Sequence, residues 1–221
     1  KRLGNTSDTA YTYGHISEAY AQKNDFKMAH LNIDKSLRLH EEVGIKDAIG
    51  GLYFGKGALY AYENKLDLSL EYFNRALKIF DDLRGESLPS VYTLAEIGKV
   101  YCLSKNYKKS LLFFEKCKSL MKKIGMSDGD YYFIVHLYLS FISKELNHNY
   151  KIENTDKYID SINEFDEKVY LLLYDLTDDP SYLKSAYDKI QKMLSNTDDG
   201  LKNKFISYPI PKRILEEYKK L

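Results

Sequence analysis

A repeat of about 40 residues runs through the first half of this 221-residue chain and constrains its fold more than any other feature. Gly4, Gly44, Gly85 and Gly125 lie 40, 41 and 40 residues apart, and each follows a run of residues with helical periodicity. Glycine is the usual residue after a helix, because it adopts the left-handed conformation at little steric cost. Recurrence at this spacing indicates that one supersecondary unit is stacked several times.

A polar turn lies midway between successive glycines. The three turns contain Asn24, Asn64 and Asn106, and asparagine tolerates the left-handed conformation that ends a helix. Each unit is therefore predicted to contain a helix, a tight turn, a second helix and a glycine stop.

Small and large residues recur in the same phase of each unit. Small residues at fixed positions let two helix backbones approach closely, and large residues one or two turns away fill the neighbouring groove. The first helix carries the rows Ser17, Gly57, Gly98 and Tyr20, Tyr60, Tyr101; the second carries Ala29, Ser69, Ser110, then Ile33, Phe73, Phe114, then Ser36, Ala76, Cys117.

These rows resemble the tetratricopeptide repeat (TPR), in which large, glycine and large residues mark helix A and alanine, aromatic and alanine mark helix B. The usual period is about 34 residues, and the longer period resembles the long-helix variant of kinesin light chains and bacterial signalling proteins. The resemblance implies an all-α fold, a right-handed TPR superhelix of antiparallel helix hairpins that ends in a C-terminal capping helix.

The whole chain is predicted to be one helical repeat domain. Because it begins in mid-pattern, we expect residues 1–6 to be the tail of a truncated preceding repeat, and the uncovered apolar end to allow homo-oligomer formation. We expect a shorter, degenerate second helix at 154–165. The predicted boundaries are 7–44, 47–85 and 87–125 for regular repeats, 128–195 for degenerate repeats and 196–221 for the cap.

The C-terminal tail carries a second resemblance. Residues 169–188, together with 204–211 and the short helix that follows, resemble the end of bacterial multidomain signalling proteins. In those proteins a nucleotide cyclase or kinase domain, an ATPase and a TPR array follow one another. The resemblance implies that this chain is the regulatory C-terminal region of a larger signalling protein.

Composition excludes several classes of protein. The chain has 33 Lys and Arg against 32 Asp and Glu, and a net charge of +1 argues against gross attraction to nucleic acid or anionic lipid. The longest nearly apolar run, 131–142, is shorter than the roughly 20 residues of a membrane span. Cys102 and Cys117 are predicted to be too far apart for a disulfide, and two reduced thiols fit a cytoplasmic location.

No set of residues points to catalysis. The five histidines are scattered and form no ligand pair at helical spacing. The glycines at 50–51 and 55–57 lie within a predicted helix, with no preceding strand to build a phosphate loop. The sequence therefore predicts no enzyme within these residues, and no catalytic, cofactor-binding or metal-binding residue.

The resemblance to TPR proteins implies that a concave groove holds a protein or peptide partner. Its Lys and Asn carboxylate clamp is missing, so an apolar helix or extended segment is expected, with Phe54, Tyr62 and Tyr92 as anchors. The groove residues implied by position are Tyr11, Glu18, Gln22, Phe54, Ala58, Tyr62, Tyr92, Lys99 and Leu103.

Two alternatives to a scaffold that holds a partner in its groove stay open. Residues 99–125 contain eight lysines against Glu115, a net of +7, and most are expected on a solvated convex face. One alternative is a nucleic-acid-binding helical array that uses residues 99–123. The other is a peptide-sensing regulator whose superhelix pitch changes with ligand. The convex basic patch is predicted to contain Lys105, Lys108, Lys109 and Lys116.

Overall fold

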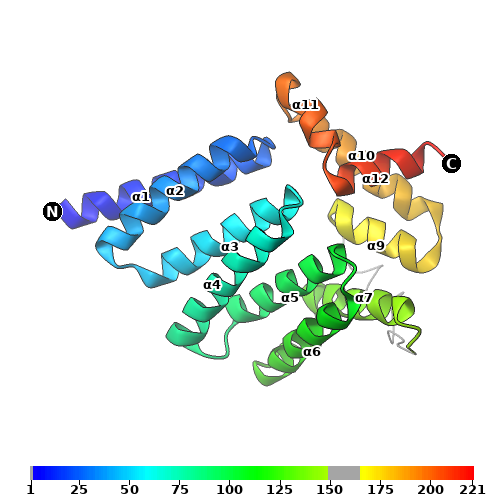
Figure 1. Ribbon diagram of the computed structural model, residues 1–221, viewed down its shortest axis with the longest axis horizontal. Helices are drawn as coiled ribbons and strands as arrows, with labels where there is room; N and C mark the ends of the chain where they lie inside the picture. The colour runs from blue at the N-terminus through cyan, green and yellow to red at the C-terminus, as the bar shows by residue number, and fades with distance from the viewer. Residues whose placement is uncertain (1, 149–164) are drawn as a thin grey trace. The chain divides into compact units, whose positions relative to one another are not determined.

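A computed structural model describes residues 2–148 and 165–221, and over these residues the chain forms α-helices and no strand (Figure 1). The apolar run 131–142 lies inside one of these helices. The helix expected at 154–165 lies, apart from Phe165, outside the described residues. The helices are α1 (Arg2–Gln22), α2 (Phe26–Val43), α3 (Lys46–Tyr62), α4 (Leu66–Arg84), α5 (Leu88–Leu103), α6 (Tyr107–Lys123), α7 (Asp130–Glu145), α9 (Glu167–Thr177), α10 (Pro180–Ser195), α11 (Asp199–Ile206) and α12 (Pro209–Tyr218).

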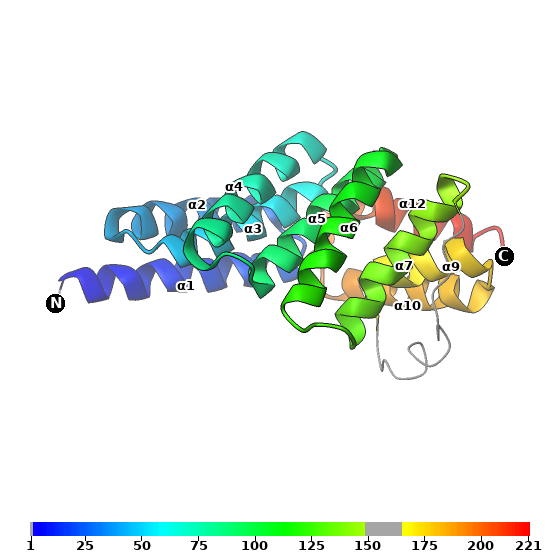
Figure 2. The same ribbon diagram turned by 90° about the horizontal axis from the view of Figure 1, so that it is seen from below.

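The chain divides into two compact units. The first unit is Lys1–Gly85 with Asn196–Phe205, and the second is Glu86–Ser195 with Ile206–Leu221. The first holds the hairpins α1–α2 and α3–α4, and the second holds the hairpin α5–α6 with α7, α9, α10 and α12. Figures 1 and 2 show the two helices of each hairpin side by side. The predicted cap, 196–221, is thus shared between the two units.

Close contact between paired helices explains the glycines of the repeat. A Cβ atom added at Gly57 would lie 2.8 Å from Cδ1 of Phe73, and one added at Gly98 would lie 2.8 Å from Cδ2 of Phe114. Real side chains do not approach so closely, and both phenylalanines are fully buried. The helix A glycine therefore makes room for the helix B ring.

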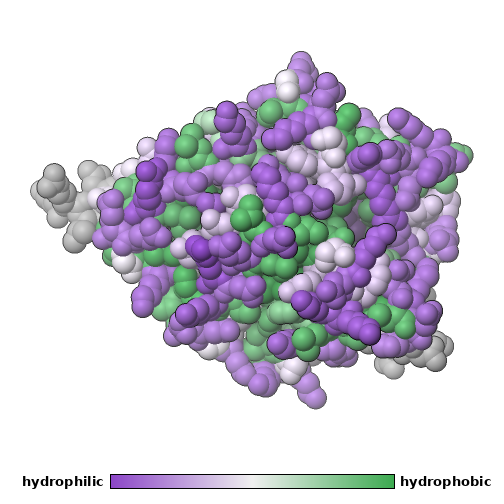
Figure 3. Space-filling model, in the orientation of Figure 1, coloured by the Kyte–Doolittle hydropathy of each residue, from purple (hydrophilic) through white to green (hydrophobic). Residues whose placement is uncertain are grey.

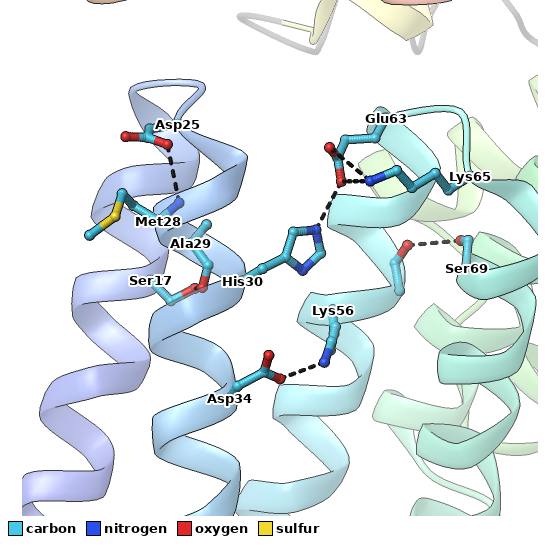
Figure 4. Close-up of polar contacts among 11 residues, drawn as sticks. Ser17, Asp25, Met28, Ala29, His30, Asp34, Lys56, Glu63, Lys65 and Ser69 are labelled. Carbon is cyan, nitrogen blue, oxygen red and sulfur yellow. Dashed lines mark hydrogen bonds and ion pairs between the residues drawn. The ribbon is translucent and has the colours of Figure 1, made fainter.

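One serine hydroxyl bridges the two helices of each hairpin at the same level. Ser69 and Ser110, on the second helices, donate hydrogen bonds of 2.8 and 2.7 Å to the carbonyl oxygens of the facing glycines. In the first hairpin the direction is reversed: Ser17 on α1 donates to the carbonyl of Ala29 on α2, at 2.8 Å (Figure 4). There the aromatic position holds the smaller Ile33, so the first helix has space for a serine side chain.

The glycine stops are confirmed at three of four positions. Gly44 and Gly125 have a φ of 75° and Gly85 a φ of 60°, the left-handed values that favour glycine. The fourth prediction is wrong, because α1 runs without interruption from Arg2 to Gln22 and Gly4 lies inside it. The repeat boundaries, including that of residues 1–6, stay predictions.

The turns inside the hairpins follow the prediction at two of three sites. Asn24 and Asn64 are left-handed, with φ values of 59° and 61°. In the third turn the left-handed residue is Lys105, with a φ of 57°. Asn106 instead caps the N-terminus of α6, where its side chain accepts a hydrogen bond from the backbone N–H of Lys109 at 3.3 Å.

Helix α7 is deeply buried in the second unit. Phe133, Val135, Leu137 and Leu139 of α7 are all at most 1% exposed, so α7 is buried on more than one face.

Within the described ranges, no helix combines the length and apolar character needed to cross a bilayer. On the face shown in Figure 3, apolar side chains lie among polar ones.

Candidate partner-binding site

In the first unit, the aromatic residues predicted for the groove pack against other rings. The ring of Phe54 is half-buried and lies 5.4 Å from that of Phe73. Tyr62 lies 5.2 Å from Phe26, and the 47% exposed Tyr11 meets His40 edge-on at 4.7 Å. The two anchors predicted in this unit, Phe54 and Tyr62, are therefore partly committed to internal contacts.

The other predicted groove residues of this unit are small or polar. Glu18 and Gln22 are exposed on α1, and Glu18 lies 3.5 Å from the equally exposed His15. Ala58 is half-buried on α3.

In the second unit, Tyr92 and Lys99 are held by residues of α5 and α7. Tyr92 meets the ring of Tyr131 edge-on, at 4.6 Å between centroids. Lys99 forms an ion pair of 2.7 Å with Glu96, and its ammonium lies 5.6 Å from the ring centroid of Tyr138. Burial opposes the charge of Lys99, but the Glu96 carboxylate outweighs it and raises its pKa above the ordinary value.

A cavity of about 320 Å³ opens in the second unit, within the size range of small-ligand pockets. The predicted groove residue Leu103 and its neighbour Cys102 form its α5 side. The buried side chains of Tyr138, Leu171 and Leu172 form part of its apolar wall. Further lining residues are Lys105, Tyr107, Phe141, Lys168, Asp175, Pro209, Ile210 and Arg213. The cavity therefore combines one predicted groove residue with helices that lie more than 60 residues further along the chain.

Charged side chains fix the α12 side of the cavity to α9. The guanidinium of Arg213 donates to both carboxylate oxygens of Asp175, in one case over 2.9 Å, and its Nε donates to Glu217 over 2.8 Å. These carboxylates overcome the effect of burial and raise the pKa of Arg213. Lys144 on α7 donates to the backbone carbonyl of Asp175 at 2.8 Å. These contacts link α7, α9 and α12 at the edge of the cavity.

Two titratable groups on the cavity wall, the thiol of Cys102 and the phenol of Tyr107, are uncharged at neutral pH. Burial raises the pKa of the Cys102 thiol to about 12. Burial and a hydrogen bond with Glu145 raise the pKa of Tyr107 to about 12. A protonated thiol is a poor nucleophile.

The predicted basic patch lies partly over aromatic rings. Lys109 lies 5.3 Å from the ring centroid of Tyr101, and Lys116 lies 5.1 Å from that of Phe113. The two rings stack on each other at 5.5 Å. Lys108 is exposed on α6. Lys105 lines the cavity described above.

Sequence reasoning missed the polar contacts that join α2 to α3 and its C-terminal end (Figure 4). His30 contacts Glu63 at 2.9 Å, and Lys56 contacts Asp34 at 2.5 Å. Lys56 is only 7% exposed, although it carries a charge that is rarely buried without a partner. Its position directly before Gly57 was the available signal, but its partner Asp34 lies 22 residues earlier.

No cluster of three or more His, Cys, Asp or Glu side chains suited to a metal ion occurs among the residues placed by the structure.

Comparisons with known proteins agree with this architecture. No family model matches the sequence, and no curated protein matches it significantly. Among solved structures, BtubC (BKLC) from P. vanneervenii is similar with a TM-score of 0.55 and 11% identity, over 99% of this chain and 88% of that one. A variant of a kinesin light chain-like protein with nearly identical TPR-like repeats, from Podosopora anserina, gives a TM-score of 0.53 and 11% identity, over 97% and 94% of the two chains. The chain therefore has the TPR-like helical-repeat fold.

Proposed function

We propose that this protein is a non-catalytic scaffold that binds a protein or peptide segment. The observation that carries the proposal is the cavity of about 320 Å³, in which Leu103 and Cys102 meet apolar residues of α7, α9 and α12. It has room for one or two large apolar side chains, and its walls carry no activated nucleophile. Apolar anchors that enter such a pocket supply most of the affinity in many complexes.

The regulatory role is a further part of the proposal. The tail that resembles bacterial signalling proteins includes α9 and α12, and both helices line the cavity. A partner bound there would contact the part of the chain that the resemblance assigns to regulation. The two unpaired cysteines support a reducing compartment, which fits the cytoplasm. Self-association through the N-terminal end stays a prediction.

Selection of peptides from a random displayed library against the full chain tests the cavity. Affinity of a selected peptide is then measured by fluorescence polarisation for the chain and for Leu103→Arg. Leu103 is 42% exposed, so the substitution alters the cavity with little effect on folding. We expect binding to weaken about tenfold or more.

Leu112→Arg is the matched control, because Leu112 is 52% exposed in the same unit and does not line the cavity. It should bind the peptide like the unmodified chain. Equal affinity of Leu103→Arg and Leu112→Arg would show that the cavity is not the binding site.

Nucleic-acid binding is a second candidate, favoured by the stacked Tyr101 and Phe113 rings with Lys109 and Lys116 over them. Aromatic rings among basic side chains are typical of single-strand recognition. This function predicts binding to single-stranded RNA that weakens with salt and is lost in Lys108→Glu with Lys109→Glu. Unchanged binding of RNA by that variant would exclude this role of the patch.

A further inference from the structure

A ten-residue segment near the C-terminal end of the chain packs on the first unit. The segment Asn196–Phe205 belongs to that unit, although the residues on both sides of it, Glu86–Ser195 and Ile206–Leu221, belong to the second. It includes most of α11. We call it the 196–205 segment.

Two side chains near its ends anchor the 196–205 segment. The amide nitrogen Nδ2 of Asn24 donates a 2.7 Å hydrogen bond to Oγ1 of Thr197, and both residues are only 5% exposed. Eight residues later, the ring of Phe205 stacks on that of Tyr62, with 6.3 Å between centroids and an interplanar angle of 16°. Phe205 is 1% exposed. A hydroxyl and an aromatic ring are thus held at opposite ends of a short helix.

The receiving surface is formed by the ends of the hairpins. Asn24 lies in the α1–α2 turn with a left-handed φ of 59°, which directs its amide from a fixed backbone position. Tyr62 is the last residue of α3 and also contacts Phe26, the first residue of α2. Tyr62 is one of the predicted partner anchors. A ring of the chain itself therefore occupies a position that the resemblance assigns to a partner.

The segment has little intrinsic tendency to form a helix. α11 has eight residues, with Gly200 at its second position, and helices of this length are not stable alone. The segment becomes ordered only when it docks, and the conformational entropy lost on ordering offsets part of the free energy of its contacts. Short elements of this kind open locally at lower free energy than the helices beneath them.

We propose that the surface formed by Asn24, Phe26 and Tyr62 docks a helix of a partner protein that carries a Ser or Thr and, eight residues later, a Phe. The 196–205 segment occupies this surface in the free chain and therefore competes with the partner helix for it. The site is separate from the cavity of the second unit and does not depend on it.

The tether determines how a competing helix behaves. A segment held at both ends has an effective concentration in the millimolar range. A free peptide with the same contacts therefore binds weakly to the intact chain. When the contacts of the segment are weakened, the same peptide should bind more tightly, since the surface is then open.

A fluorescein-labelled peptide with the sequence of residues 195–207 tests the proposal by fluorescence polarisation against the full chain. We expect about tenfold or more tighter binding to Phe205→Ala than to the unmodified chain. Asn203→Ala is the matched control, because Asn203 is an exposed residue of α11, and it should bind like the unmodified chain. A peptide whose own Phe is replaced by Ala should not bind Phe205→Ala.

A second substitution locates the peptide on the surface. Asn24→Gly keeps the left-handed turn but removes the amide donor, so in the Phe205→Ala chain it should weaken peptide binding several-fold. If circular dichroism shows that Phe205→Ala is unfolded, Thr197→Val takes its place as the opened chain. Equal peptide affinity of the opened and unmodified chains, or no binding to either, would overturn the proposal. Leu103→Arg should leave this binding unchanged, so the proposal for this surface and the proposal for the cavity are tested separately.

Discussion

The ammonium of Lys56 lies 2.5 Å from a carboxylate oxygen of Asp34 and links α3 to α2. The Lys56 side chain is 9% exposed, whereas that of Asp34 is 48% exposed, so the two partners lose unequal amounts of hydration. Most of the desolvation cost of the pair therefore falls on the lysine. Its ammonium also lies 4.8 Å from the ring centroid of Tyr72.

Removing the carboxylate should cost more than removing the lysine. Asp34→Asn leaves a nearly buried ammonium without its counter-charge, and we expect it to lower the free energy of unfolding by about 1 to 2 kcal/mol. Lys56→Met keeps the length of the side chain and should cost less. Urea unfolding followed by circular dichroism measures both. A larger loss for Lys56→Met would show that the charge itself stabilises the hairpin contact.

The helix A glycine and the helix B ring should be coupled energetically. Gly57→Ser places a side chain where Phe73 allows none, and we expect a loss of about 1 to 3 kcal/mol. Phe73→Ile reproduces the first hairpin, where Ser17 faces Ile33. The double variant should therefore lose less than the sum of the two single variants. Additive losses in this double-mutant cycle would contradict the steric explanation.

The stability of the fold should fall as the pH is lowered below 6.5. Burial, with a smaller contribution from Lys118, lowers the pKa of His136 from 6.5 to about 4. The unfolded chain then takes up a proton at higher pH than the folded chain, so the contribution of His136 is complete above 6.5 and declines towards about 4.

His136→Phe should flatten the pH dependence of the melting temperature in this window, and it keeps a ring against Tyr132. A residual slope is expected from His30, whose pKa is also lowered by burial. His15→Gln, at an exposed position, is the control and should retain the slope of the unmodified chain. An unchanged slope in His136→Phe would show that this histidine does not titrate abnormally.

Both thiols should resist modification in the folded protein. Burial raises the pKa of Cys117 and Cys102 to about 12, and Cys117 is fully buried. Because the thiolate is the reactive form, we expect reaction with Ellman's reagent at pH 8 to be slow until denaturant is added. Rapid reaction of one thiol in the native chain would identify Cys102 as accessible through the cavity.

Local patterns predicted the hairpins because their determinants lie close together in the sequence. The glycine stops and the Gly57–Phe73 contact depend on residues within one repeat. The third turn was assigned to the wrong residue, because the repeat register aligns Lys105, and not Asn106, with the left-handed Asn24 and Asn64. Asn106 corresponds to Asp25, and both side chains cap the helix that follows them.

The sites could be predicted only in part, because their residues come from distant segments. Leu103 was expected to face a partner, but its cavity is completed by residues as far along as Arg213. The contact of Asn24 with Thr197 spans 173 positions, and no periodicity connects those two residues. Buried charges such as Lys56 also depend on the partner that tertiary packing supplies.

The reversed serine hydrogen bond has a consequence for how this repeat is recognised in other chains. Positions 12 residues apart hold Ser and Ala in the first hairpin but Gly and Ser in the next two, and one hydroxyl is retained in every case. A sequence profile that scores each position separately averages the two residue combinations and gives neither a high score. The combination of residues at the two positions is what recurs, so a search that scores the two positions jointly should detect hairpins of this kind at lower overall similarity.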